Sequence, residues 1–155
     1  MDDRTELHWR YLKDNLDHSR HHEVLRAAGT NIIVAVSTGG FAVIGFDRCI
    51  SSSDLPLVAF LFCLGVFGSL FAVAQTERAA RHYARARALR DEIDRSGIGT
   101  DFAGFKQIGD TAHEAKHPRL SRLKLVLFWV SIHASVSVLA GLVFLLWLLG
   151  GTCAP

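Results

Sequence analysis

Apolar residues gather in three blocks of the chain, residues 27–46, 55–74 and 125–149, and none of the blocks contains Asp, Glu, Lys or Arg. An α-helix needs about 20 residues to cross the hydrocarbon core of a bilayer, so each block is long enough to do so. Blocks of this kind separated by polar chain are typical of integral membrane proteins. We therefore predict an all-α integral membrane protein with three transmembrane helices.

The polar chain beside the first two blocks also has a helical pattern. In residues 1–26, Trp9, Leu12 and Leu16 recur at spacings of three and four, which predicts an amphipathic helix leading into the first span. Residues 75–96 follow the second span without a Gly or Pro, so we predict one continuous helix from Leu55 to Arg95. The first two transmembrane helices should thus extend into a helical stalk.

The other segments are short. Residues 47–54 form a loop that makes the first two spans a tight antiparallel hairpin, and residues 97–118 are predicted to be a linker. The third transmembrane segment, 119–149, begins with a basic lead-in, and residues 150–155 form a tail.

Two antiparallel helices rise equally per residue. If Ser37 and Gly65 lie at the same depth in the membrane, residues of the stalk whose numbers sum to about 102 lie opposite each other. Asp17 would then face Arg85, and Asp14 would lie near Arg87 and Arg90. The second arm has an apolar stripe at helical spacing, formed by Ala79, Tyr83, Ala86, Leu89 and Ile93. The predicted stalk contacts are therefore Asp14, Asp17, His82, Tyr83, Arg85, Leu89 and Ile93.

Charge distribution predicts the topology, although the net charge of +2 says little. Lys and Arg are concentrated in residues 1–26 and 75–124, whereas the first loop has only Arg48 and the tail has none. The positive-inside rule places the N-terminus in the cytoplasm and the C-terminus outside, which we assign to a bacterial inner membrane. Cys49 and Cys153 then both lie outside, where either a disulfide or two free thiols would be compatible with the sequence.

No motif for catalysis or for cofactor binding is present: the chain has no P-loop, G-x-G-x-x-G, G-x-S-x-G or paired C-x-x-C. We expect no enzyme activity and no cofactor. The arginines of residues 75–95 could contact nucleic acid or anionic headgroups, but interleaved acids and alanines favour a packed, solvated helix. We therefore expect no nucleic-acid partner.

Three histidines in the first arm, His18, His21 and His22, stand at i, i+3 and i+4. This spacing can bind a metal on a helix. The alternative, which we favour, is a titratable, solvated face near the membrane. No metal site is predicted.

Polar and small residues within the spans could line a water-filled path or could hydrogen-bond between helices. His133 is the ionisable one, and the full set is Asn31, Ser37, Thr38, Ser131, His133 and Ser135. Small residues four apart predict close helix packing at Ala35 and Gly39, Gly65 and Ser69, and Ser137 and Gly141.

A polar helix entering a two-span hairpin, followed by a helix containing Glu77, His82, Tyr83, Leu89 and Ile93, resembles the SLATT-type membrane effectors of bacterial conflict systems. The resemblance covers residues 16–95. It implies spans that form pores when a nucleotide-signalling partner is triggered. The third span and the lack of a visible sensor domain depart from that pattern.

These observations predict a self-associating inner-membrane protein, in contact with the lipid bilayer as a homo-oligomer, that permeabilises or conducts across the membrane. An anti-phage role would follow from the resemblance. The alternative is a non-catalytic membrane anchor or accessory subunit whose stalk docks a cytoplasmic protein partner through the stripe of residues 79–93.

Overall fold

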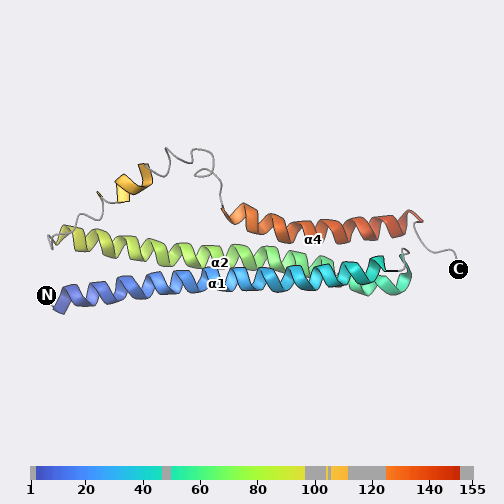
Figure 1. The fold of residues 1–155 in the computed structure, drawn as a ribbon, viewed down its shortest axis with the longest axis horizontal. Coiled ribbons are helices and arrows are strands. Elements are labelled where there is room, and N and C mark those ends of the chain that lie inside the picture. Colours follow the sequence, from blue (N-terminus) through green and yellow to red (C-terminus); the bar gives the residue numbers. More distant parts are fainter. Residues whose placement is uncertain (1–2, 47–49, 97–103, 105, 112–124, 151–155) are drawn as a thin grey trace. The chain divides into compact units, whose positions relative to one another are not determined.

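The computed structural model describes residues 3–46, 50–96, 104, 106–111 and 125–150. Every regular element in these residues is helical, and residues 106–111 are helical as well (Figure 1). The elements are α1 (Asp3–Gly45), the 3-10 helix η1 (Ser52–Asp54), α2 (Leu55–Arg95) and α4 (Leu125–Leu148). The predicted pair Cys49 and Cys153 lies outside the described residues.

Three of these helices, α1, α2 and α4, are long and apolar enough to cross a membrane. This finding confirms the predicted all-α fold with three transmembrane helices. The chain is a multi-pass membrane protein.

Local signals in the sequence set where α2 begins and ends. The backbone N–H of Ser51 donates to Oδ2 of Asp54 at 2.8 Å, and Pro56 occupies the first turn of α2, where a missing N–H costs nothing. At the far end, Ser96 Oγ donates to the carbonyl oxygen of Ile93 at 2.6 Å. The box formed by Ser51 and Asp54 thus caps η1, which leads directly into the 41-residue helix α2, and Ser96 closes the last turn of α2.

The chain forms two compact units that share α1 and α2. The polar unit comprises residues 1–24 and 75–124, and the apolar unit comprises residues 25–74 and 125–155. Each unit has a core of its own.

The inward face of α2 follows a strict heptad-like spacing of three and four. These seam residues are buried or half-buried: Val58, Leu61, Gly65, Gly68, Ala72, Gln75, Ala79, His82, Ala86, Leu89 and Ile93. A repeat of 3.5 residues is the geometry of helices that supercoil and interlock side chains. Small seam residues, five of which are Gly or Ala, let a neighbouring helix come close.

In the apolar unit the core lies at the meeting of α1, α2 and α4. Ile44, Val58, Leu61 and Ala140 form its buried cluster. Leu61 is completely buried and fills the space beside Gly40, where an added Cβ would come within 2.9 Å of its Cδ2. Association of helices in lipid depends on such close van der Waals packing because lipid tails are as apolar as the core.

In the polar unit α1 and α2 pair through a smaller apolar cluster. Leu12, Ala86 and Ile93 are its buried members, and Trp9, Leu16 and Leu89 pack against it. Here burial of apolar area from water drives the pairing, as in soluble helical hairpins. Leu89 and Ile93 therefore make the stalk contacts predicted for them.

Candidate functional sites

His133 joins the three helices of the apolar unit. Its side chain is completely buried, and Nε2 lies 3.1 Å from Oγ1 of Thr30 on α1. Its ring lies against Gly68 of α2, where an added Cβ would come 2.7 Å from the His133 Cγ. Of the two alternatives considered for His133, these contacts correspond to hydrogen bonding between helices.

Gly65 brings the backbones of α2 and α4 into contact. A Cβ added at Gly65 would lie 2.7 Å from both the His133 carbonyl oxygen and the Ser137 backbone nitrogen. Ser137 Oγ donates to the carbonyl oxygen of Phe62 at 3.0 Å, so a hydrogen bond crosses the same contact. Ser69 instead donates to the Gly65 carbonyl oxygen within α2, at 3.0 Å.

Three other predicted packing residues do not pack within the described chain. No atom lies within 4 Å of a Cβ added at Gly39 or Gly141, and Ala35 is exposed. The prediction for these residues requires correction because spacing alone does not say which face of a helix meets a neighbour. Ala35 and Gly39 are exposed on α1, and Gly141 of α4 lines an open groove beside α2.

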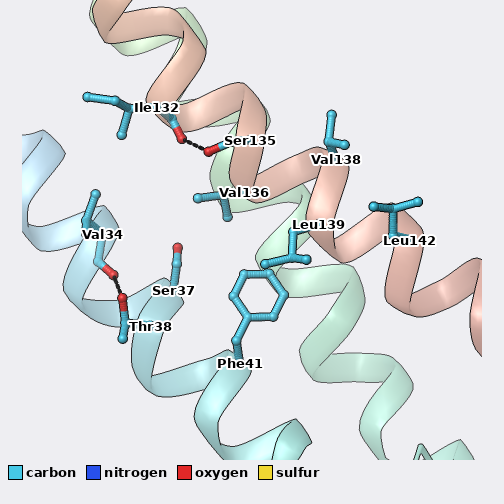
Figure 2. Close-up of a pocket in the computed structure, with 10 residues that line it drawn as sticks. All are labelled: Val34, Ser37, Thr38, Phe41, Ile132, Ser135, Val136, Val138, Leu139 and Leu142. Atoms are coloured by element: carbon cyan, nitrogen blue, oxygen red, sulfur yellow. Dashed lines mark hydrogen bonds between the residues drawn. The ribbon is translucent and has the colours of Figure 1, made fainter.

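A groove of about 530 Å³ runs between α1 and α4. Figure 2 shows the residues that line it: Val34, Ser37, Thr38, Phe41, Ile132, Ser135, Val136, Val138, Leu139 and Leu142. Thr38 Oγ1 donates to the Val34 carbonyl oxygen at 2.8 Å and Ser135 Oγ to that of Ile132 at 2.7 Å. Ser37 Oγ is buried and has no hydrogen-bond partner among the described residues.

The other two polar residues of the predicted set face outward. Asn31 on α1 and Ser131 on α4 are exposed, and Ser131 Oγ donates to the Phe128 carbonyl oxygen at 2.8 Å. The six predicted polar residues thus separate into His133 in the interior, Ser37 buried at the groove, and four side chains on the outer surface.

The hydroxyl of Thr30 should contribute measurably to the stability of the apolar unit. Thr30→Val removes the partner of His133 Nε2, and such bonds in membranes contribute about 0.5 to 2 kcal/mol. We expect a loss of that size in a denaturant titration of the protein in detergent micelles. The matched control is Thr38→Val, since the Thr38 hydroxyl bonds only its own helix and is exposed. Equal effects of the two substitutions would contradict the role assigned to Thr30.

Polar side chains join α1 to α2 in the polar unit. His82 Nδ1 lies 3.1 Å from Asn15 Oδ1, and His22 Nδ1 lies 2.8 Å from Gln75 Oε1. Ser19 is completely buried, and its Oγ donates to the Ala79 carbonyl oxygen at 3.2 Å. Buried polar groups of this kind fix the register of paired helices.

The predicted register of the stalk requires correction. Asp14 Oδ1 lies 3.5 Å from His18 Nε2 and Asp17 Oδ1 lies 3.5 Å from Arg20 Nη1, so both acids have their polar partners on α1 itself. Both acids are exposed, and water solvates them better than a helix interface would. Arg85 is also exposed, and Tyr83 OH donates to Glu23 at 3.4 Å.

His82 of α2 contacts two of the three α1 histidines whose spacing could bind a metal. The ring centroid of His82 lies 5.2 Å from that of His18 and 5.7 Å from that of His22, and the ring centroid of His21 lies 6.0 Å from that of His22. Within the described part of the chain, no group of three His, Cys, Asp or Glu is arranged to hold a metal. We call His18, His22 and His82 the histidine cluster.

The environment of His82 disfavours its charged form. The pKa of His82 is lowered from its ordinary value of 6.5, first by burial and then by electrostatic interaction with His18, Arg85 and His22. The carboxylate of Asp14 acts in the opposite direction. His82 is therefore neutral at neutral pH.

Four buried polar residues at the helix contacts were not among the predicted site residues: Thr30, Asn15, Ser19 and Gln75. A pattern could have found the α1 residues, because Leu12, Asn15, Ser19 and His22 recur at spacings of three and four. Their polarity concealed the stripe, since only apolar residues had been used to define the inner face.

Comparisons of the chain with protein-family models, with curated proteins and with solved structures find no match.

Proposed function

We propose that this protein associates with further copies of itself in the membrane and that the assembly permeabilises or conducts. The observation that carries the proposal is the groove between α1 and α4, which Ser37 and Thr38 of α1 and Ser135 of α4 line (Figure 2). Hydroxyl groups at a surface covered by lipid tails have no partners beyond their own helix. Several copies with this groove turned inward would give these groups polar partners or water.

A conducting path through a single copy has no support from the interior of the apolar unit. Leu61, Ala72, His133 and Ala140 are each completely buried there, and glycine contacts close the space between α2 and α4. Side chains packed at such density leave no room for water. The proposed path therefore runs between copies and not among the three helices of one copy.

The apolar stripe of residues 79–93 on α2 is largely buried, which weighs against the alternative function as a docking anchor. That function needs the stripe of residues 79–93 to be free, but Ala79, Ala86 and Ile93 are only 4%, 3% and 1% exposed. α1 already covers this stripe in the polar unit. A partner protein would have to displace α1 or bind elsewhere.

We place the protein in a bacterial inner membrane with the N-terminus and the polar unit in the cytoplasm, on the support of the Lys and Arg distribution. Pore formation by several copies is also what the resemblance to SLATT-type effectors implies. An anti-phage role is part of the same proposal.

The proposal is tested by ion flux from liposomes that contain the purified protein. Thr38→Val and Ser135→Ala remove the two exposed hydroxyls of the groove without adding bulk, so we expect flux to fall by about tenfold or more, as dewetting of a pore requires. Cys63→Val is the matched control, since exposed Cys63 lines a different groove, between α2 and α4.

Subunit counting by single-molecule photobleaching in the same liposomes tests the association directly. Single copies at every protein-to-lipid ratio would contradict self-association. Flux that falls equally in the Cys63→Val control would contradict the assignment of the α1–α4 groove to the conducting path.

A further inference from the structure

Three imidazole rings lie together in the polar unit, and they come from two different helices. His18 and His22 are one turn apart on α1, and the His82 ring of α2 stacks on both, with interplanar angles of 26°. His82 and His22 also take part in the interface between the two helices. His82 is hydrogen-bonded to Asn15 of α1, and His22 is hydrogen-bonded to Gln75 of α2. The pairing of α1 with α2 therefore passes directly through the histidine cluster.

The hydrogen-bond partners of His82 and His22 require that each ring carries its proton on Nδ1. Asn15 Nδ2 donates to the Tyr11 carbonyl oxygen at 2.8 Å, which leaves Asn15 Oδ1 to accept from Nδ1–H of His82. Nδ1–H of His22 likewise donates to Oε1 of Gln75. An additional proton must therefore bind at Nε2 of each ring and give it a full positive charge.

Few acids are placed to neutralise such charges. Asp14 on α1 lies 3.5 Å from His18, and it is the acid that acts on His82. The partners that face His82 and His22 across the interface, Asn15 and Gln75, are uncharged, and Arg85 on α2 adds a positive charge. Glu23 on α1 accepts from Tyr83, and Asp17 pairs with Arg20 on the same helix.

We propose that protonation of the histidine cluster separates α1 from α2 within the polar unit, so that the pairing of these two helices depends on pH in the mildly acidic range. Two or three like charges held about 5 to 6 Å apart repel each other, and the repulsion is relieved when the helices separate and water solvates the rings. This inference is independent of the proposed conduction.

The direction of the pH dependence follows from the His82 environment. Its pKa is lower in the paired state than its ordinary value of 6.5, so the separated state binds more protons below pH 6.5. Pairing is therefore fully stable above that pH and weakens as the pH falls through the lowered pKa of the paired state. Acid stabilises the separated helices.

The experiment measures the distance between α1 and α2 by electron spin resonance on the full chain in lipid nanodiscs. Nitroxide labels are placed at exposed Lys13 and Ala88 through Lys13→Cys and Ala88→Cys, with the three native cysteines replaced by alanine. We expect one short distance at about pH 8, and at about pH 5.5 we expect the population at that distance to fall by about twofold or more.

Two variants separate the histidine cluster from general effects of acid. The combined variant His18→Gln, His22→Gln and His82→Gln should keep the short distance at both pH values, because glutamine does not titrate in this range. His82→Lys carries a charge at all these pH values, so protonation of either His18 or His22 is enough to create repulsion, and the short distance should be lost at a higher pH than in the native chain. His8→Gln is the control, a histidine of α1 outside the cluster, and it should respond to pH like the native chain.

The inference is overturned if the native chain keeps the short distance at about pH 5.5 while histidine NMR shifts report protonated rings. Retention of the short distance in His82→Lys at about pH 5.5 would also overturn it. If the combined glutamine variant does not fold, the native chain and His82→Lys still decide the outcome. Loss of the proposed conduction would leave all of these results unchanged.

Discussion

Gly65→Leu is expected to force α4 away from α2 and to destabilise the apolar unit by about 3 kcal/mol. The reason is that the neighbours of an added Cβ include backbone atoms, the His133 carbonyl oxygen and the Ser137 nitrogen, both at 2.7 Å. A flexible side chain could rotate away, whereas a helix backbone must move as a whole. The measurement is the fraction of folded protein during titration with SDS in mixed micelles.

Gly141→Leu is the matched control for this substitution. It places the same side chain at another helical glycine in a span, but no atom lies within 4 Å of a Cβ added there. We expect its titration midpoint to stay close to that of the native chain. If Gly65→Leu were as stable as Gly141→Leu, the close approach of α2 and α4 at Gly65 would be wrong.

Ile93→Ala is expected to produce the largest loss of stability in the polar unit. Ile93 is 1% exposed and packs with Leu12 and Ala86, so its truncation leaves a cavity that costs about 2 to 5 kcal/mol. Amide hydrogens of α1 and α2 in the polar unit should then exchange about 30-fold faster or more, because 1.4 kcal/mol corresponds to a factor of ten. Hydrogen exchange read by mass spectrometry measures this change.

Leu7→Ala provides the comparison, because Leu7 lies on α1 in the same unit but is 53% exposed. Its truncation should leave the exchange rates nearly unchanged. Faster exchange in Leu7→Ala than in Ile93→Ala would contradict the position of the core. Unchanged exchange in both variants would show that the cluster of Leu12, Ala86 and Ile93 does not hold the helices together.

The sequence predicted the helices well because helix formation and membrane crossing depend on local properties. Three local features carried the prediction: the lengths of the apolar blocks, the absence of Gly and Pro from residues 75–96, and Pro56 in the first turn of a helix. The helix α2, Leu55–Arg95, has the bounds that the sequence indicated. The membrane class followed from the same blocks.

The contacts between helices were predicted less well because they depend on which face of each helix points inward. An assumed register put Asp17 opposite Arg85, whereas the observed partners, Asn15 with His82 and His22 with Gln75, differ from it by roughly one helical turn. Such a shift changes no local preference. It is decided by how side chains from distant parts of the chain fit together.

The sequence by itself determined that this chain is all-α and crosses a membrane, since hydropathy and helix continuity are summed along the chain. Only the tertiary structure decided that His133 is buried against Gly68 and bonded to Thr30, and that His82 joins His18 and His22. The reason is physical: a polar residue in a helix is equally compatible with an inner or an outer position until the neighbouring helices are in place. Packing at glycines and the pairing of buried polar groups then select one arrangement.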